Sequence, residues 1–447
     1  MMSLENIQDL ISSLHLKLKQ APYISGLKRV SISLDIGDTT LKEVLSRFSY
    51  SKKGYMKSVK CNQEIIFIGS AMTYTSSLPM KKSKQDEMNV FIQETSCNLY
   101  GGTAFLSVDT AKNNEWEGIS DSEYWVAYIE ILKEKDKVLL WCNWPKHMGE
   151  ASAVILEKLT ECLQLDGNPN DGKKDSFLVL GNAHNPDYPL WHSQVNDSLN
   201  AIQEHKIEKI VLAKQTVFEL EKAIDASLLV QQISNIEPSC SVFFQQFSSD
   251  LSFLSVTPET LFLREGNNLT VDVIAGTQQV KADNTFDDSL LNNTKNLREH
   301  KFVYSHVLNV LKNIATAIRS DSTHTLLKLA YVEHITKQVT AVAKKGVSDF
   351  DILECLHPTP AVAGHPTEAV LALIKQNETF NRGWYAGAVG VLGKEKTELL
   401  VGIRSCVIRA RKITVFTGAG IVEGSTPEKE WEELLAKTKT YMAVSRG

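Results

Sequence analysis

The segment Leu356–Pro366 constrains the fold more than any other stretch, because it reads LHPTPAVAGHP. Proline fixes φ and has no backbone N–H to donate, so three prolines and a glycine cannot continue as a regular helix or strand. We expect a rigid, irregular loop here, followed after Arg382–Gly387 (RGWYAG) by an apolar strand. A Pro-rich connector is the simpler interpretation, but shaped loops beside a packed scaffold are where recognition sites are usually built.

Bulk composition excludes several classes of protein. The chain has 447 residues, 43% of them hydrophobic, which allows two to three domains or one large unit. Its net charge is −5 with acidic and basic residues interspersed, so no basic stripe indicates nucleic acid. No stretch reaches the ~18 apolar residues of a membrane span, and the start of the chain has helical periodicity rather than a signal-peptide pattern. The seven cysteines form no CxxC pair, which favours reduced thiols. We therefore expect a cytoplasmic protein with neither a nucleic acid nor a membrane as partner.

Groups of strands alternate with groups of helices, which favours α+β layering over a doubly wound parallel sheet. We predict large antiparallel sheets packed face to face as a sandwich, with helices on the outside. Segments 76–87 and 166–174 are polar and are predicted as a loop and a linker. The predicted helices are the N-terminal segment, 192–206 and 289–319. The predicted strands are 30–36, 65–68, 138–142, 209–213, 241–247, 251–255, 260–264, 269–274 and further strands between 384 and 422, broken near 393–396 and 409–412.

Two ionisable residues lie where a purely structural protein would not need them. Lys209 opens the apolar strand 209–213. It is either a solvated lysine at the strand's start or a desolvated amine that acts as a base. Glu259 lies between two apolar strands, where Pro258 prevents regular central pairing and fixes the approach of the glutamate. A solvated turn is the alternative for this second motif.

Two predicted helices carry glutamates that suit a hard cation. Glu299 lies inside the long helix, and the helix after residues 424–428 has a capping serine or threonine and a proline in its first turn. Glu430, Glu433 and Lys437 fall on one face of that second helix. Mg²⁺ takes one or two carboxylates and fills its other positions with water and substrate oxygens, so Glu299 and Glu433 are sufficient. A simple Glu433–Lys437 pair is the plainer alternative.

Small and cationic residues complete a candidate anion site. Residues 274–277 (IAGT) end a predicted strand with Gly276 and Thr277, which allows close approach of a ligand to the backbone. Residues 418–420 (GAG) let backbone N–H groups face an anion, and Arg404, in a predicted strand, suits a carboxylate. Together these features predict a site for a small anionic molecule with a divalent ion, a base and an acid.

An ordered set of motifs resembles the chorismate-utilising enzymes, and most strongly the isochorismate synthases of menaquinone or siderophore pathways. The set is KIVLAK, TPET, IAGT, EH, VEHI, LHPTPAVAG, RGWYAGAVG, GIRS and GAGIVEGSTPEKEWEELLAK, between about Lys206 and Lys437. The resemblance implies one α+β unit over residues 1–447. Within it, residues 1–175 carry little signature and residues 185–447 form the chorismate-binding catalytic region.

The resemblance also implies a Mg²⁺-dependent isomerase that adds water at C2 of chorismate and expels the C4 hydroxyl. Lys209 would activate the water and Glu259 would protonate the leaving hydroxyl from the opposite face of the ring. Glu299 and Glu433 would hold Mg²⁺, with Glu430 supporting it through water. The implied substrate-binding residues are Gly276, Thr277, His334, Ala361, Tyr385, Arg404, Gly418, Gly420 and Lys437.

Three positions narrow the chemistry within this resemblance. Anthranilate-type relatives lack the base lysine, which is present here as Lys209. Aminodeoxychorismate-type relatives place a lysine nucleophile where this chain has Ala275. Salicylate synthases tend to carry a threonine where Ala361 lies. The chain has no Gly-x-Cys-x-Gly motif of a glutaminase, so we expect water as the nucleophile and no glutaminase subunit.

Some positions depart from the family pattern, and two alternatives stay open. Lys214 and Gln278 replace arginines, Thr257 replaces a serine and Glu333 replaces a glutamine. None of these removes a proposed catalytic group, although the charge changes at Gln278 and Glu333 bear on substrate affinity.

The alternatives are a salicylate synthase, which also eliminates pyruvate, and a non-catalytic chorismate-binding protein. A monomer or weak homodimer is expected in each case.

Overall fold

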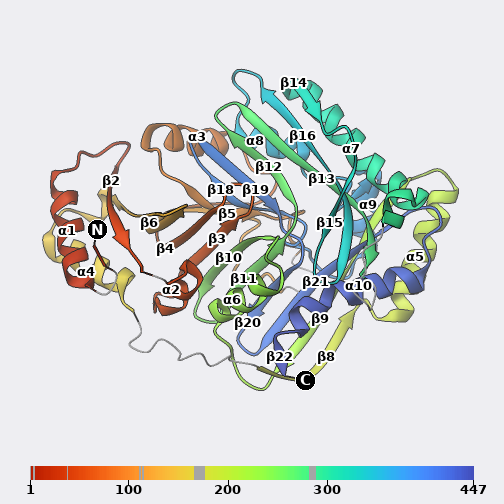
Figure 1. The fold of residues 1–447 in the computed structure, drawn as a ribbon, viewed down its shortest axis with the longest axis horizontal. Helices are drawn as coiled ribbons and strands as arrows, with labels where there is room; N and C mark the ends of the chain where they lie inside the picture. The colour runs from red at the N-terminus through yellow and green to blue at the C-terminus, as the bar shows by residue number, and fades with distance from the viewer. Residues whose placement is uncertain are drawn as a thin grey trace.

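The computed structural model describes residues 2–3, 6–37, 39–109, 112, 115–165, 177–280 and 288–446 (Figure 1). The linker predicted at 166–174 lies outside these ranges. Strands fill the middle of the molecule and helices lie around them, in agreement with the predicted α+β class.

One continuous sheet divides into two arms at β6 (Ser122–Glu134). One edge of β6 pairs with β4 (Gln63–Ser76) along its whole length. Its other edge pairs first with β5 (Leu99–Thr103) and then with β7 (Lys137–Pro145). Because β6 is shared, the first arm starts at β4 and the second arm starts at β5.

Both arms are antiparallel throughout. The first arm continues from β4 through β3 (Lys53–Ser58), β10 (Ser241–Ser248), β11 (Leu251–Thr257), β20 (Ser405–Arg409), β21 (Lys412–Ile421), β9 (Lys209–Leu220) and β8 (Phe177–Asn185). The second arm continues from β5 through β18 (Ala388–Leu392), β19 (Lys396–Val401), β12 (Thr260–Glu265), β13 (Asn268–Gln279) and β16 (Val332–Ala343). The remaining strands are β1 (Met2–Ser3), β2 (Leu27–Asp35), β14 (Ala315–Ser320), β15 (Thr325–Lys328), β17 (Gly364–His365) and β22 (Ser445–Arg446).

The chain crosses between the two arms at two places that matter for function. It leaves β11 in the first arm and enters β12 in the second arm through Pro258 and Glu259. It returns from β19 to β20 through residues 402–404. Regular strand pairing stops at such crossovers, so their side chains are free of the alternation that a strand imposes. Both crossovers lie at one cavity between the arms.

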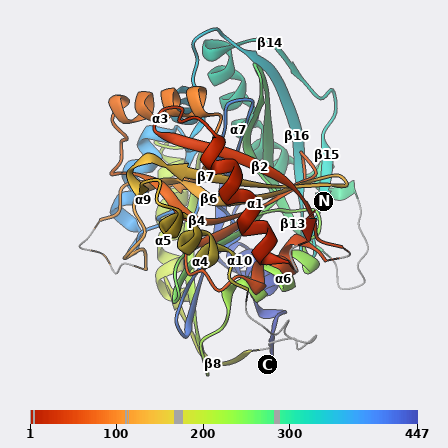
Figure 2. The same cartoon turned by 90° about the vertical axis from the view of Figure 1, so that its left-hand side faces the viewer.

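The helices cover the outside of the sheet, as Figures 1 and 2 show from two directions. Helices α1 and α4 pack on each other at the N-terminal end, α7 packs on β13, and α10 packs on β21. Their bounds are α1 (Ile7–Gln20), α2 (Leu41–Arg47), α3 (Lys82–Thr95), α4 (Ser152–Leu163), α5 (Tyr188–Gln203), α6 (Ala226–Ile236), α7 (Thr294–Ile314), α8 (Asp349–Leu356), α9 (Thr367–Asn377) and α10 (Pro427–Met442), with short 3₁₀ turns η1 (Lys146–Met148) and η2 (Asp288–Asn292).

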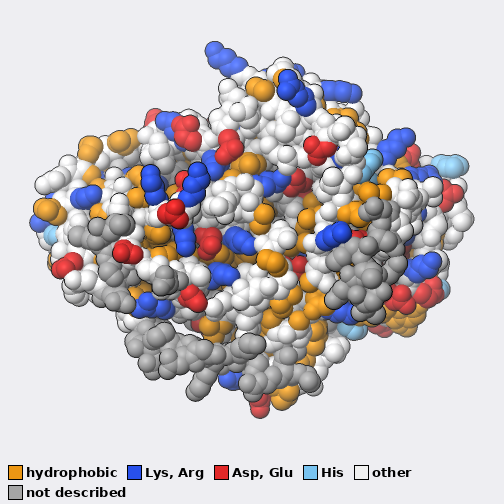
Figure 3. Space-filling view, viewed as in Figure 1, with side chains coloured by type: hydrophobic (Ala, Val, Ile, Leu, Met, Phe, Trp, Pro, Cys, Tyr) orange, Lys and Arg blue, Asp and Glu red, His pale blue; other side chains and the backbone are white. Residues whose placement is uncertain are grey.

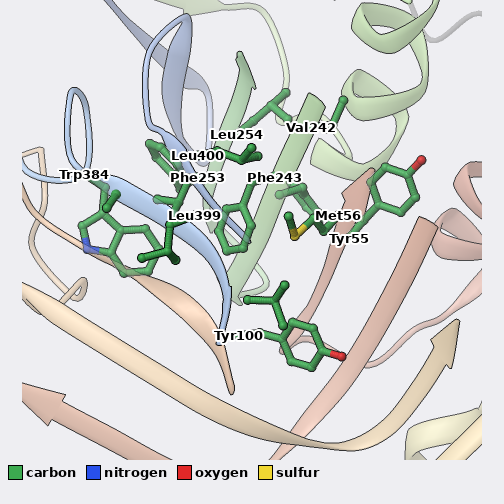
Figure 4. Packing of buried hydrophobic residues seen from close by; sticks show 14 of the residues in the cluster. Tyr55, Met56, Tyr100, Val242, Phe243, Phe253, Leu254, Trp384, Leu399 and Leu400 are labelled. Carbon is green, nitrogen blue, oxygen red and sulfur yellow. The ribbon is translucent and has the colours of Figure 1, made fainter. Parts of the chain in front are cut away.

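Aromatic side chains join the two arms near their common root (Figure 4). Trp384 packs against Phe253 of the first arm, with ring centroids 5.6 Å apart. Tyr100 of the second arm stacks on Phe67 of the first at 4.3 Å. All four side chains are almost completely buried, and burying each stabilises the fold by roughly 2–3 kcal/mol. The core therefore holds the arms at a fixed spacing.

Two predicted boundaries are wrong. The loop expected at 76–87 is shorter, because α3 already begins at Lys82. The helix expected at 289–319 ends at Ile314, and the chain continues as β14, which pairs with β16. Apolar residues continue at helical spacing past Ile314, so periodicity alone did not reveal that the sheet takes over the chain there.

The distribution of charge on the surface agrees with the mixture of acidic and basic residues in the sequence. On the face seen in Figure 3, basic and acidic side chains are interspersed. None of the helices in the described ranges has the length and apolar character that crossing a bilayer requires.

Candidate active site

A cavity with about 690 Å³ of free space, counted to its open mouth, lies between the two arms, α7, α10 and the 356–366 loop. Residues from all of these segments line it, which explains why a Pro-rich loop interrupts the fold here. Twelve of the fourteen predicted site residues line this one cavity. They are Glu259, Gly276, Thr277, Glu299, His334, Ala361, Tyr385, Arg404, Gly418, Gly420, Glu433 and Lys437.

Lys209 lies directly behind the cavity wall formed by Gly420. Its side chain is completely buried, and its Nζ lies 2.9 Å from Oε1 of Glu299. A Cβ on Gly420 would meet Lys209 Cε at 3.2 Å and collide with Glu299 Oε1. Glycine at 420 is therefore required for the lysine and the glutamate to meet. Burial acts to raise the pKa of Glu299, but Lys209, Lys295 and Lys437 lower it on balance.

Glu259 is the buried carboxyl at the first crossover, with 3% of its surface exposed. Its backbone is tied down, because its N–H donates to Thr257 Oγ1 (3.2 Å) and its carbonyl accepts from Val401 N (3.0 Å). Burial, helped by the nearby Asp272, raises the pKa of Glu259 to about 8, and Lys209 opposes this rise. The carboxyl is therefore protonated at neutral pH, which is the state that a general acid needs.

Glu299 on α7 and Glu433 on α10 bring two carboxylates to the cavity from separate helices. Within the described residues, no cluster of three or more Asp, Glu, His or Cys side chains could hold a metal ion alone. Two hard oxygen ligands still fit Mg²⁺, which keeps water or substrate oxygens in its other positions. Glu433 Oε1 also accepts from Lys437 Nζ at 2.7 Å, so this carboxylate has a cationic partner without a metal.

Glu430 lies on the same helix but does not line the cavity. Its Oε1 lies 2.5 Å from Nζ of Lys295 on α7. Burial and Glu433 raise the pKa of Glu430, while Lys295 lowers it. The sequence prediction missed Lys295, although it precedes Glu299 by four residues and so shares its helix face.

A chain of hydrogen bonds along the cavity wall joins Arg404, His334 and Thr277. Arg404 Nη2 lies 3.1 Å from His334 Nε2, and His334 Nδ1 lies 3.1 Å from Thr277 Oγ1. Since a guanidinium only donates, Nε2 accepts and the imidazole proton is assigned to Nδ1. Burial, then Arg404 and Lys437, lower the pKa of His334 well below its usual value, so it is neutral. The prediction that Arg404 lies in a strand is wrong, because the residue precedes β20 at a crossover and has a left-handed φ of 46°.

The two small-residue motifs lie inside strands rather than at strand ends. Gly276 has φ +79° in a bulge of β13, where a Cβ would meet the Asn296 carbonyl at 2.9 Å. Gly418 lies within β21, and a Cβ there would collide with Tyr385 Oη. Strand β20 pairs only with residues 412–416 of β21. Beyond that point, in the described part of the chain, one backbone edge of β21 has no strand partner, and the carbonyl of Gly418 accepts from Lys437 Nζ at 2.7 Å.

A second, larger cavity of about 1400 Å³ lies near α3, α8 and α9. Its walls are mostly apolar, and its buried charges Arg382 and Glu378 pair with each other. The guanidinium of Arg382 also donates to the carbonyls of Val211 and Val362 at 2.8 Å, and both of these residues line the first cavity. This ion pair is therefore a support of the site's wall.

Comparisons with known proteins show the family to which the chain belongs. The chain matches the model of the chorismate binding enzyme family over residues 18–444. It is 37% identical over 260 residues to the isochorismate synthase MenF of Haemophilus influenzae, covering 57% of this chain and 60% of that relative. It is 27% identical over 355 residues to the MenF of Bacillus subtilis, covering 78% and 74%. The structure of the menaquinone-specific isochorismate synthase MenF from Escherichia coli superposes with a TM-score of 0.85 at 22% identity, covering 99% of this chain and 100% of that one. The chain belongs to the chorismate binding enzymes.

Proposed function

We propose that this protein is an isochorismate synthase, which converts chorismate reversibly to isochorismate with the help of Mg²⁺. The observation that carries the proposal is a neutral buried acid, Glu259, in the wall of the cavity, together with a buried amine, Lys209, directly behind Gly420 of the same cavity. A protein that only bound chorismate would need the cationic groups but neither of these two.

Each group then has a role in the reaction. Lys209, in its neutral form, takes a proton from water as the water oxygen bonds to C2 of the ring. Glu259 gives its proton to the C4 hydroxyl as the C4–O bond breaks, and the ring double bonds shift between the two carbons. One water enters and one leaves, so the product is an isomer of the substrate. Groups from separate elements suit attack and departure on opposite faces of the ring.

Binding uses the remaining residues of the cavity. Arg404, Lys437, Tyr385 and the backbone at residues 418–420 hold the substrate carboxylates. Neutral His334 and Thr277, beside Gly276, line the ring pocket. Glu299 and Glu433 would hold Mg²⁺, with Glu430 behind them, and the metal would supply positive charge for a substrate carboxylate. We further propose a cytoplasmic enzyme, monomeric or weakly dimeric, that needs no glutaminase subunit.

The product spectrum from chorismate tests this proposal. With Mg²⁺, the protein should convert chorismate to isochorismate until the two are in equilibrium. Chromatography of the reaction mixture measures both compounds. Salicylate and pyruvate as main products would instead place it with the salicylate synthases. Binding without turnover would make it a chorismate-binding protein.

Ala361 offers a sharper version of this test, because it lines the cavity where salicylate synthases tend to carry threonine. Ala361→Thr should increase the share of pyruvate among the products. An unchanged ratio of pyruvate to isochorismate would show that residue 361 does not determine which product forms.

A further inference from the structure

Arg404 needs outside support to present its guanidinium to the cavity. Its backbone is held at the crossover, because its carbonyl accepts from Tyr441 Oη (2.6 Å) and from Val256 N (3.1 Å). Its side chain has four rotatable bonds, and ordering such a side chain costs about 2 kcal/mol of rotamer freedom. A fixed backbone alone therefore does not place the charge.

Glu237 provides that support from outside the cavity. It follows α6 as its C-terminal cap and is 2% exposed. Its Oε1 lies 3.3 Å from Arg404 Nη1, in an ion pair in which both side chains are buried. Since Glu237 is not among the lining residues, it touches the site only through Arg404.

The carboxylate of Glu237 is itself rigidly held. Oε1 also accepts from Thr440 Oγ1 of α10 at 3.2 Å, and Oε2 accepts from the backbone N–H of Ala330 at 3.2 Å. Donors from three separate segments therefore converge on one buried carboxylate. Charge-assisted hydrogen bonds of this kind are stronger than neutral ones and fix geometry as well as energy.

The two ends of the guanidinium have different partners. Nη1 faces Glu237, whereas Nη2 faces His334 Nε2. A guanidinium carries five N–H groups in a planar fork, so these two bonds set its plane and leave other N–H groups for a ligand. The plane of the fork is what decides whether it meets a carboxylate with two parallel hydrogen bonds.

We propose that Glu237 is a positioning residue for substrate binding, which aims the Arg404 guanidinium at a carboxylate of the substrate and keeps it bonded to His334. The proposal rests on the proposed function for the identity of the substrate. It assigns to Glu237 no contact with substrate and no part in proton transfer.

Two variants separate positioning from simple charge balance. Glu237→Ala removes the anchor and should weaken chorismate binding in the presence of Mg²⁺ by about 10- to 100-fold, from the size of a charge-assisted hydrogen bond. The turnover number kcat should change much less. If Glu237 served only to neutralise Arg404, its loss would tighten the binding of a dianion instead.

Glu237→Gln is the conservative variant. Its amide oxygen can still accept from Arg404 and Thr440, and it loses the bond from Ala330 N. It should recover most of the affinity that Glu237→Ala loses. Glu130→Ala is the matched control, because it breaks another buried Arg–Glu pair whose two residues do not line the cavity, so it should leave chorismate affinity unchanged.

Calorimetric titration of chorismate with Mg²⁺ into each variant, run beside the product assay, tests the proposal. Weaker binding in the alanine variant with recovery in the glutamine variant supports it. Unchanged or tighter binding in a folded alanine variant overturns it. ¹⁵N NMR of the histidines gives a second readout, since the His334 Nε2 signal should shift in Glu237→Ala and an unmoved signal would count against the proposal. A wild-type protein that binds chorismate but forms no isochorismate refutes the proposed function alone, because the affinities still decide the role of Glu237.

Discussion

Two buried glutamates, Glu130 in the N-terminal region (residues 6–165) and Glu259 in the site-bearing region (residues 177–446), have opposite surroundings. Glu130 lies on β6 and accepts from Arg29 Nη1 (2.8 Å), Asn143 Nδ2 (2.6 Å) and Tyr100 Oη (2.8 Å). Burial acts to raise the pKa of Glu130, but Arg29 and these hydrogen bonds lower it on balance. Glu259 forms no ion pair among the described residues, and its pKa rises to about 8.

The difference shows how one sheet serves two purposes. Where the sheet only supports the fold, a buried carboxylate is ionised and its hydrogen-bonding capacity is used by protein groups. Where the sheet meets the cavity, the carboxyl keeps a proton that it can give away. Buried groups with strongly shifted pKa values gather at functional sites for this reason.

The largest effect should come from Glu259→Gln. Glutamine is neutral and similar in shape to the protonated glutamate, so the fold should be kept, but the acid is lost. We expect kcat to fall by about 10²- to 10⁴-fold, the usual contribution of general acid catalysis. Steady-state assays with chorismate measure this, and a melting curve checks the fold. A rate close to that of the wild-type protein would remove Glu259 from the chemistry.

Glu130→Ala should have the reverse profile. Removing this carboxylate leaves Arg29 partly buried without its counter-ion, and breaking a buried pair costs about 3–5 kcal/mol of unfolding free energy. Denaturant titration measures the loss. The kcat of the folded variant should stay at the wild-type value, and a large drop in kcat would show that the two regions are not separable in this way.

The smallest effects should come from two helix caps, one in each region. Thr40 caps α2 in a capping box with Glu43, and Thr426 caps α10 by accepting from Lys429 N. Replacing either threonine by alanine should cost about 1 kcal/mol of stability. Only Thr426→Ala should also weaken binding of Mg²⁺ and chorismate, because α10 carries Glu433. Equal binding in both variants would mean that the start of α10 does not position its glutamates.

Local patterns in the sequence predicted much of the fold. The strands predicted at 241–247, 251–255 and 260–264 agree with β10, β11 and β12, because alternating apolar residues and short turns are local signals. The predicted end of the long helix α7 was wrong, because pairing of β14 with β16 overrides the helical pattern. Local signals carry no information about such long-range pairing.

The site residues were predicted as a set, but their contacts were not. Motif order placed Lys209 and Glu299 in one site, yet their ion pair joins residues 90 positions apart. The proton on Glu259 depends on burial by both arms, which no segment shows alone. Glu237 gave no signal, because a glutamate after a helix is ordinary until Arg404 is found beside it.

The raised pKa of Glu259 also fixes the sign of a pH effect. In the unfolded chain this group ionises near its usual pKa of 4.5, whereas in the folded protein it keeps its proton to about pH 8. Its contribution to stability is therefore fully present below pH 4.5 and is lost as the pH rises through about 8. Activity that depends on the protonated acid should fall above the same value.

The most direct test of the central claim is an infrared titration of the Glu259 carboxyl, taken as the difference between the wild-type protein and Glu259→Gln. The band of a protonated carboxyl should be present at pH 7 and should disappear with a midpoint near pH 8. A midpoint near 4.5 would mean that Glu259 is ionised at neutral pH, and would contradict its role as the acid.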